Sequence, residues 1–308
     1  MADGYWAAVV QAPVEVITDP ARRDEIIAAN RERAMRAIEA ILATSAQPPK
    51  LFQFPVLMLQ GAYNEARSPE ARLAVSFELP GPEVQPLLEF CARHDIVIAS
   101  SCVERHAALP GWFFHSGMVL GPNGLLIRYP KAQARSAAGV RIIKDHIDEY
   151  AAIFGRDAVF PVVDSPLGKL ATCVEAEIMV PEVARSFAAK GAEVLLHPTV
   201  ERTTHHPWVY QPVKIARAVE NRLYVVSANI GVARMRHPVT GELEEGRTAG
   251  GSAVIGPDGV VRCSVGGSGE GWASAYIDLA ALREERSTPA PDVAYTPALY
   301  RDLYGGAR

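Results

Sequence analysis

The sequence predicts an α/β protein whose sheets contain both parallel and antiparallel strands and carry helices on their outer faces. Segments with the apolar spacing of helices alternate with short apolar runs typical of strands along nearly the whole chain. Several neighbouring strands are separated only by short turns, and such hairpins require antiparallel pairing. The combination indicates mixed sheets in one layered domain, without internal repeats or low-complexity tracts.

The composition is that of a globular protein. The chain has 308 residues, of which 49% are hydrophobic and 21% are charged. The formal net charge of −4 gives no sign of a nucleic-acid partner or an anionic membrane surface. No apolar run approaches the ~20 residues of a membrane span, and no basic stretch precedes the first short apolar run, so we expect a strand there and not a signal peptide. The four cysteines are far apart and lack a CxxC motif, which favours a reducing, cytoplasmic location.

Apolar spacing and capping residues define the elements of the first part of the chain. Asp19-Pro20 has the pattern of a helix N-cap followed by proline at the first helical position. Apolar residues then recur at helical spacing over 21–43. We expect, in chain order, a strand at 6–11, this helix, a strand at 51–54 that ends at Pro55, a helix at 83–93 and a strand at 96–101.

Turn residues predict hairpins in the rest of the chain. Pro122-Asn123-Gly124 and Pro257-Asp258-Gly259 supply the positive φ that tight turns need. The first turn joins strands expected at 118–120 and 125–129, and the second joins strands expected at 252–255 and 260–263. A third turn, at 165–168, is expected to join strands at 160–163 and 170–174. Helices at 181–190 and 208–221 and strands at 194–196 and 223–228 complete the pattern, and the long polar segments 65–79 and 134–149 are expected to form loops over a pocket.

The segment Gly168–Glu182, GKLATCVEAEIMVPE, is the most informative part of the chain. Its pattern predicts a buried strand, a sharp turn and the first turn of a helix. That geometry commonly presents a reactive side chain to a pocket. The residue at the turn is Glu175, an acid.

These segments together resemble the nitrilase, or carbon–nitrogen hydrolase, superfamily. The resemblance extends from Trp6 to Arg286 and is carried by VVQAP at Val9, GPNGLLIRYPK ending at Lys131, GKLATCVEAEIMVPEVARSFAAKGAEVLLHPT, KIARAVENRLYVVSAN and GGSAVIGPDG. It implies a four-layer α-β-β-α sandwich over residues 1–286, a C-terminal arm at 287–308 that contacts another subunit, and a homodimer or higher oligomer. It also implies a small amide, nitrile or amine-type molecule as ligand.

The resemblance implies a cysteine–glutamate–lysine site that is incomplete in this chain. The family attacks amides or nitriles with a thiolate, moves protons with a glutamate and stabilises developing charge with a lysine. Lys131 matches the lysine, and Glu149 is matched to a second glutamate that often assists. Val56 stands where the first glutamate belongs, and Glu175 stands where the cysteine belongs.

Further side chains are expected to line the pocket, and each has an ordinary structural explanation beside the functional one. His115 stands where the family favours asparagine. Glu177 lies near a helix N-terminus, where negative charge is favoured, and Trp208 would by default belong to the core. Cys173 becomes the nucleophile only after a two-residue shift, so we prefer a buried core position for it. The residues expected to bind substrate are Val56, His115, Glu177, His197, His205 and Trp208.

Three functions fit these residues. In an altered enzyme, Glu175 or Glu149 acts as general base while Lys131 polarises the ligand, and two carboxylates near one lysine raise one carboxyl pKa toward neutral. In a catalytically silent binding protein, Glu175 only replaces the lost thiolate as the anion beside Lys131. A metal-dependent hydrolase would use Glu175 and Glu177 with histidines of the 197–206 segment, among them His205, but their spacing matches no ligand pattern. We therefore expect no metal and no cofactor.

Overall fold

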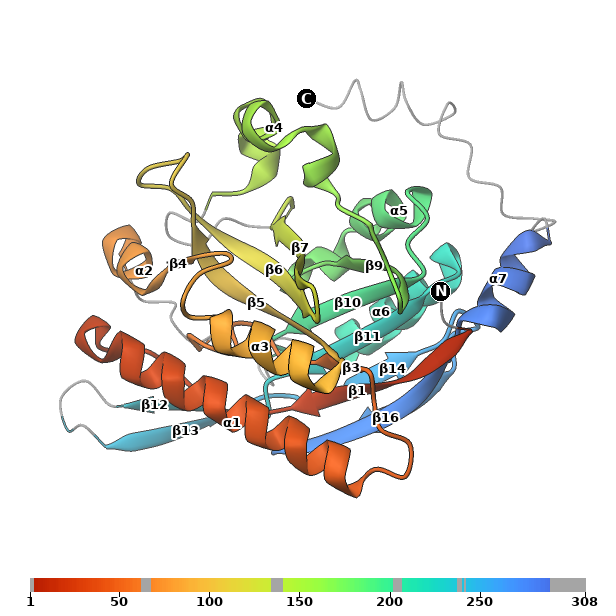
Figure 1. Ribbon diagram of the computed structural model, residues 1–308, viewed down its shortest axis with the longest axis horizontal. Coiled ribbons are helices and arrows are strands. Elements are labelled where there is room, and N and C mark those ends of the chain that lie inside the picture. The colour runs from red at the N-terminus through yellow and green to blue at the C-terminus, as the bar shows by residue number, and fades with distance from the viewer. Residues whose placement is uncertain are drawn as a thin grey trace.

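The computed structural model describes residues 3–61, 68–133, 141–201, 207–236, 240 and 242–288. Helices and strands alternate along these ranges (Figure 1). The helices are α1 (Arg23–Thr44), α2 (Pro69–Val75), α3 (Gln85–His94), α4 (Ile147–Phe154), α5 (Pro181–Ala189), α6 (Pro207–Asn221) and α7 (Leu279–Ser287), and the short 3-10 helices are Pro20–Arg22, Ile143–Asp145, Arg156–Val159 and Glu175–Met179. The strands are β1 (Gly4–Gln11), β2 (Val14–Glu15), β3 (Leu51–Gln53), β4 (Phe77–Glu78), β5 (Val97–Arg105), β6 (Phe113–Gly121), β7 (Gly124–Pro130), β8 (Val163–Ser165), β9 (Gly168–Thr172), β10 (Val194–Thr199), β11 (Tyr224–Asn229), β12 (Val232–Arg236), β13 (Leu243–Arg247), β14 (Ser252–Ile255), β15 (Val261–Val265) and β16 (Gly271–Asp278).

The strands form two large sheets of mixed direction, as the sequence predicted. The first sheet has the order β16-β1-β3-β5-β6-β7, with β4 beside β5, and the second has the order β15-β14-β11-β10-β9-β8. In the first sheet β1, β3 and β5 are parallel, while β6 pairs antiparallel with β5 and with β7. In the second, β9, β10 and β11 are parallel and β14 is antiparallel to β11. A small sheet of β13, β12 and β2 lies apart from both.

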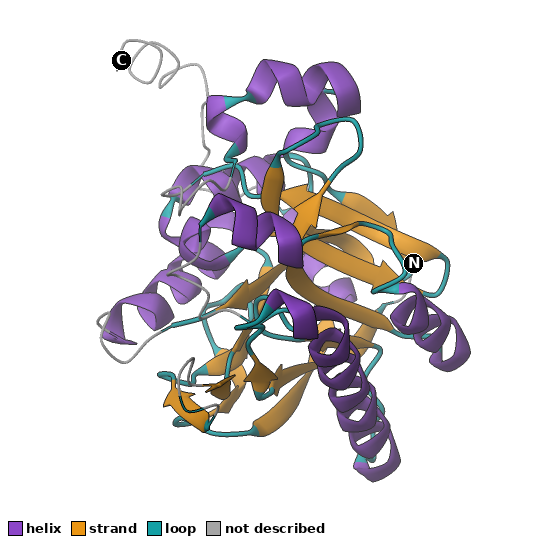
Figure 2. Cartoon of the chain, turned by 90° about the vertical axis from the view of Figure 1, so that its left-hand side faces the viewer, coloured by secondary structure: helices purple, strands orange, loops and turns teal. Residues whose placement is uncertain are grey.

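The two large sheets pack face to face, and helices cover their outer faces (Figures 1 and 2). One buried apolar cluster contains facing residues of both sheets together with residues of α5 and α6, and another joins the first sheet to α1 and α3. This arrangement is the predicted α-β-β-α sandwich. Burial of these apolar surfaces is the main favourable contribution to such a fold.

Gly117 in β6 packs directly against β9 of the other sheet. A Cβ atom at this position would lie 2.7 Å from Cγ2 of Thr172 in β9, which is closer than two such carbon atoms can approach. Glycine is therefore required by the spacing of the sheets at this point. The contact lies beside the ends of β7 and β9, where the candidate site is found.

Several elements differ from the prediction. The segment 65–79, expected to be a loop, contains α2, whose first turn is capped because the Ser68 hydroxyl accepts a hydrogen bond from the Ala71 amide at 3.3 Å. The segment expected as a second loop ends within α4. The short strands β2, β12 and β13 were not predicted, because pairing with neighbours and not apolar alternation determines them. The predicted C-terminal arm, 287–308, lies outside the described residues from 289 onward.

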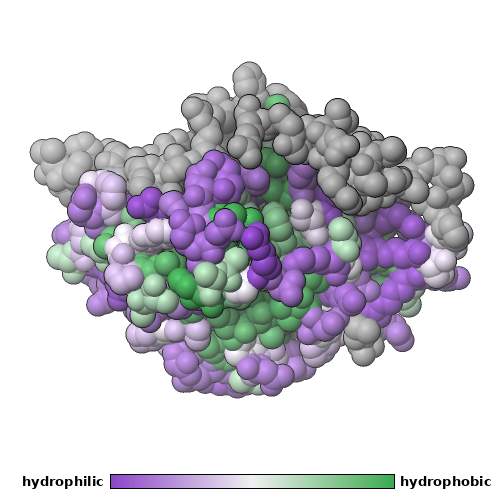
Figure 3. Space-filling model, turned by 90° about the horizontal axis from the view of Figure 1, so that it is seen from above, coloured by the Kyte–Doolittle hydropathy of each residue, from purple (hydrophilic) through white to green (hydrophobic). Residues whose placement is uncertain are grey.

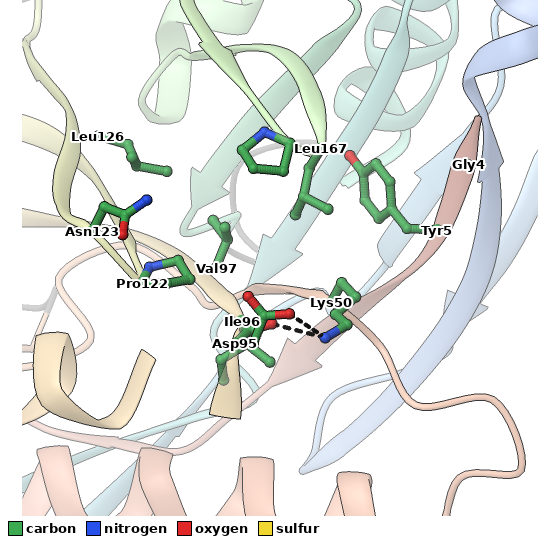
Figure 4. A pocket seen from close by; sticks show the side chains of 11 residues that line it. Gly4, Tyr5, Lys50, Asp95, Ile96, Val97, Pro122, Asn123, Leu126 and Leu167 are labelled. Atoms are coloured by element: carbon green, nitrogen blue, oxygen red, sulfur yellow. Dashed lines mark hydrogen bonds and ion pairs between the residues drawn. The ribbon is translucent and has the colours of Figure 1, made fainter. Parts of the chain in front are cut away.

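No helix within the described ranges combines the length and the apolar character needed to cross a bilayer. Viewed from above, the surface shows a central hydrophobic area beside hydrophilic residues (Figure 3). An apolar cavity of about 400 Å³ lies at the opposite end of the sheets from the candidate site, near the amino ends of β1, β3 and β5 (Figure 4). At its edge the Lys50 ammonium donates to the Asp95 carboxylate at 2.7 Å.

Candidate functional site

Lys131 and Glu175 come from different sheets and meet as an ion pair. Lys131 directly follows β7, and its backbone amide donates to the carbonyl of His115 at 2.9 Å. Glu175 follows β9 and begins a 3-10 helix. Lys131 Nζ donates to Glu175 Oε2 at 2.8 Å, and the side chains are 7% and 24% exposed. The sequence prediction that an acid at the strand-to-helix turn faces this ammonium therefore agrees with the structure.

The turn holds Glu175 in an unusual backbone conformation. Its φ is +52°, in the left-handed region that residues other than glycine seldom adopt. His197 stabilises the turn, because its Nε2 lies 2.9 Å from the Glu175 carbonyl while its Nδ1 lies 2.9 Å from Ser227 Oγ. A carbonyl can only accept, so Nε2 carries the proton and Nδ1 accepts from the serine hydroxyl.

His197 is fully buried, which differs from the substrate-binding role expected for it. Burial lowers its pKa to about 3, and the nearby Lys214 ammonium contributes in the same direction. The imidazole is therefore neutral at pH 7 and shapes the turn through the main chain.

His115 contacts the carboxylate of the pair directly. Its Nδ1 lies 3.5 Å from Glu175 Oε2, and its Nε2 lies 2.9 Å from Ser101 Oγ. The Ser101 hydroxyl accepts from the Leu57 amide at 2.9 Å, so it is placed to donate to Nε2 and to leave the His115 proton on Nδ1, toward the acid. Burial lowers the His115 pKa to about 4 in spite of Glu175. A neutral imidazole thus completes a line of polar groups from β5 to the acid.

The pair keeps both of its members charged. Burial alone would raise the pKa of Glu175, but Lys131, the neighbouring His115 and the hydrogen bond from the ammonium together lower it to about 2. Burial likewise opposes the charge of Lys131, and the attraction of Glu175 and Glu177 raises its pKa nevertheless. The expected shift of a carboxyl pKa toward neutral is therefore wrong for Glu175.

The expected pKa shift required a second carboxylate beside Lys131, and Glu149 does not supply it. It lies in α4 with 60% of its side chain exposed, and its ion-pair partner is His146 at 3.8 Å. The loose match between the 134–149 segment and the family pattern placed it too close to the lysine. The proposed catalytic role of Glu149 is corrected accordingly.

Glu177 is also corrected, from a ligand contact to a structural anchor. It is fully buried, and its carboxylate accepts hydrogen bonds from one hydroxyl and three backbone amides. The donors are Tyr129 Oη (2.8 Å) and the amides of Ala132 (2.8 Å), Gln133 (2.9 Å) and Val174 (3.0 Å). These bonds tie the chain that leaves β7 to the turn after β9, so Glu177 fixes the distance between the ammonium and the acid.

The remaining predicted residues lie in three kinds of place. Val56 is fully buried in the apolar cluster between the sheets and offers no polar group. His205 lies outside the described residues, and of Trp208 the structure describes the backbone, in α6, but not the side chain. Cys173 is fully buried, and burial raises its thiol pKa well above the usual value, which agrees with a core position. Within the described ranges, no group of three or more histidine, cysteine or acidic side chains is arranged to hold a metal ion.

Sequence reasoning missed several polar residues around the pair. Ser101 and Ser227 are fully buried in their strands, and a serine in a buried strand is a signal that its hydroxyl has a specific partner. A second buried ion pair, Lys214 Nζ to Glu201 Oε1 at 2.6 Å, lies nearby, with side chains 0% and 4% exposed. The sequence does not indicate that Lys214 is buried, because a lysine within a helix is usually exposed to solvent.

Comparison with known proteins identifies the family. Residues 6–287 match the carbon-nitrogen hydrolase family. The chain is a carbon-nitrogen hydrolase family member. The fold of this family member is similar to that of Saccharomyces cerevisiae Nit3, with a TM-score of 0.66, 18% identity and coverage of 95% of this chain and 97% of the other. An amidase from Nesterenkonia sp. gives a TM-score of 0.64 and 21% identity over 98% of both chains.

This carbon-nitrogen hydrolase family member is also similar in sequence to enzymes with known activities, of which two are described here. A formamidase of Bacillus cereus (strain Q1) is 28% identical over 232 residues, which cover 74% of this chain and 62% of the formamidase. A bifunctional nitrilase/nitrile hydratase of Nicotiana tabacum is 27% identical over 220 residues, covering 67% of this chain and 58% of that enzyme. The match spans less than two thirds of the length of either relative.

Proposed function

We propose that this protein binds a small amide through Lys131 and Glu175 and acts on its carbon–nitrogen bond without a thiol. The observation that carries the proposal is the ammonium–carboxylate pair, 2.8 Å apart, at the strand-to-helix turn. The similarity to a formamidase and to an amidase supports the same substrate class. So does the similarity to an amidase variant from Nesterenkonia sp. that was crystallised in complex with butyramide.

The pair is chemically complementary to an amide group. A primary amide offers a carbonyl oxygen that accepts and N–H groups that donate. The Lys131 ammonium has three donors, of which one is used by Glu175, and the carboxylate can accept a further bond. A nitrile offers an acceptor without a donor and therefore satisfies half of the pair. This comparison favours an amide over a nitrile as ligand.

The chemistry that fits these groups is direct attack by water. The water oxygen adds to the carbonyl carbon, its proton passes to Glu175, and Lys131 stabilises the negative charge on the former carbonyl oxygen. The proton then passes to the amine as the carbon–nitrogen bond breaks. A carboxyl with a pKa of about 2 is a weak base. A bound ligand that excludes water from the pair would add to the burial that already opposes the charge of Glu175, and so raise that pKa toward its usual range.

The second candidate is a binding protein without turnover. It is favoured by the same low pKa and by the direct contact of the two opposite charges, which together make Glu175 a weak base at neutral pH. In that case the pair binds the amide, but the carbon–nitrogen bond is not cleaved.

Calorimetric titration with butyramide and butyronitrile, together with an assay for released ammonia, tests both candidates. We expect butyramide to bind more tightly, and Lys131→Met and Glu175→Gln each to weaken binding about tenfold or more, because each removes a charge-assisted hydrogen bond. Glu149→Gln is the matched control and should bind like the natural protein. Ammonia release that disappears in Glu175→Gln supports the enzyme, and binding without ammonia release supports the silent protein. Equal binding by all four proteins, or none by any, contradicts the proposal.

A further inference from the structure

The apolar cavity of Figure 4 lies at the ends of the strands that are remote from the candidate site. Leu126 in β7 lines this cavity, and Lys131 follows in the same direction five residues later, which is about 16 Å at the usual rise of a strand. Leu167, another lining residue, directly precedes β9, and Glu175 comes after the other end of that strand. A small ligand in the cavity therefore does not reach the Lys131–Glu175 pair.

The size and the floor of the cavity suit an aromatic molecule. Its volume is about 400 Å³, within the range of small-molecule pockets. Since an apolar cavity of about 150 Å³ is large enough for benzene, this one can hold a molecule of two fused rings. The floor consists of the buried side chains of Tyr5, Ile96, Val97 and Leu167, with the half-buried Leu126 beside them. A flat ring can pack against the Tyr5 ring there, whereas a charged group would lose its hydration.

Hydrogen bonds of the main chain hold the walls of the cavity in place. The Lys50 amide donates to the Trp6 carbonyl at 2.8 Å, and the Lys50 carbonyl accepts from the Val97 amide at 2.8 Å. On the side of the second sheet, the Leu167 amide donates to Ser165 Oγ at 3.1 Å. The cavity is therefore formed before a ligand arrives, which lowers the entropic cost of binding a rigid molecule.

The edge of the cavity carries an ion pair that a ligand can reach. Lys50 and Asp95 both line the cavity, and their side chains are 45% and 78% exposed (Figure 4). Lys50 Nζ donates to Asp95 Oδ2 at 2.7 Å and to the Asp95 carbonyl at 3.1 Å. In the described part of the chain the ammonium thus uses two of its three donors, and the third is available to a ligand.

This ion pair favours an uncharged polar group on the ligand. The two opposite charges lie side by side, so an anion attracted by Lys50 is repelled by Asp95, and a cation attracted by Asp95 is repelled by Lys50. A hydroxyl group can accept from the ammonium and donate to the carboxylate at the same time. The edge and the floor of the cavity together therefore suit an aromatic body that carries one hydroxyl group.

We propose that this cavity binds an uncharged phenol or aromatic alcohol, with its rings on the apolar floor and its hydroxyl group at Lys50 and Asp95. Binding there is independent of the proposed function, because the ligand does not contact Lys131 or Glu175. The protein then has two small-molecule sites, one at each end of the sandwich.

Titration with naphthol, followed by the fluorescence of the naphthyl group, tests the proposal. Naphthol should bind about tenfold more tightly than naphthalene, the usual effect of a hydrogen bond to a charged group. It should also bind more tightly than naphthoate, whose negative charge meets Asp95. A large excess of butyramide should leave the affinity for naphthol unchanged, because the two ligands occupy different sites.

Two variants locate the bound naphthol. Leu126→Trp should fill the cavity and weaken naphthol binding tenfold or more. Leu125→Trp is the matched control and should bind naphthol like the natural protein, because Leu125 is the neighbouring residue of β7 and packs on the other face of the sheet. Lys50→Met alters a half-exposed side chain, so it keeps the proposal testable if Leu126→Trp does not fold. It should reduce the affinity for naphthol to that for naphthalene and leave naphthalene binding unchanged.

The proposal is overturned if naphthol does not bind, or if naphthoate binds more tightly than naphthol. It is also overturned if Leu126→Trp or Lys50→Met binds naphthol as the natural protein does, or if Leu125→Trp loses binding to the same extent as Leu126→Trp. Displacement of naphthol by butyramide would place the ligand at the Lys131–Glu175 pair and overturn it as well. Naphthol binding without any binding of butyramide would support this site and contradict only the proposed function.

Discussion

Replacing Glu175 by glutamine should destabilise the protein in a pH-dependent way. The ordinary pKa of 4.5 falls to about 2 in the folded protein, and the side chain is about one quarter exposed. At 1.36 kcal/mol per pKa unit, this difference corresponds to about 3 kcal/mol of folding free energy. The folded pKa is depressed, so this contribution is complete above the unfolded pKa of 4.5 and is lost as pH falls through 4.5 toward 2.

Urea unfolding of the natural protein and of Glu175→Gln at several pH values measures this contribution. We expect the two free energies of unfolding to differ by about 3 kcal/mol at pH 7 and by about 1 kcal/mol at pH 3. Glu149→Gln, exposed on α4, serves as the control and should follow the natural protein at every pH. A difference that stays constant between pH 7 and pH 3, or a more stable glutamine variant, would refute the assignment of the low pKa to the Lys131 pair.

Three further outcomes follow from the same geometry. In Glu175→Cys the new thiol should react with iodoacetamide, while the fully buried Cys173 should remain unmodified, as measured by peptide mass mapping. Labelling of Cys173 in the natural protein would contradict the strand register. Glu177→Gln should lower the free energy of unfolding by about 2 kcal/mol, because its amide nitrogen would face a backbone N–H, and an unchanged thermal midpoint would dispute its anchoring role. The pKa of His115 falls to about 4 on folding, so stability should be lost as pH falls through 6.5 toward 4. In His115→Gln the free energy of unfolding should depend less on pH in that range. Identical pH profiles of the two proteins would argue against a buried neutral imidazole.

The fold was largely predictable because its signals are local. The turns at 122–124 and 257–259 carry residues that tolerate positive φ, and both hairpins form as predicted. The capping pattern at Asp19-Pro20 likewise marks the start of the 3-10 helix Pro20–Arg22, which leads directly into α1, and the Asp19 side chain accepts from the Ala21 amide there at 2.9 Å. Elements such as β2 and β12 escaped prediction because they exist through pairing with distant segments.

The candidate site was predictable only in part. The pairing of Lys131 with Glu175 followed from two well-defined strand ends, whereas the helix that carries Glu149, α4, was not predicted, so nothing in the sequence fixed the position of that acid. The anchoring role of Glu177 depends on backbone amides from another sheet, and these cannot be recognised from the identity of the side chain. The Glu201–Lys214 pair depends in the same way on a contact between residues that no local pattern connects.

Gly117 lies where the two sheets pack together, and the Lys131–Glu175 pair can form only when both sheets are in place. The ammonium belongs to one half and the acid to the other, so neither half alone contains the chemistry. The ion pair therefore depends on how the sheets pack, and a larger side chain at residue 117 would act on it indirectly, by forcing β6 and β9 to adjust.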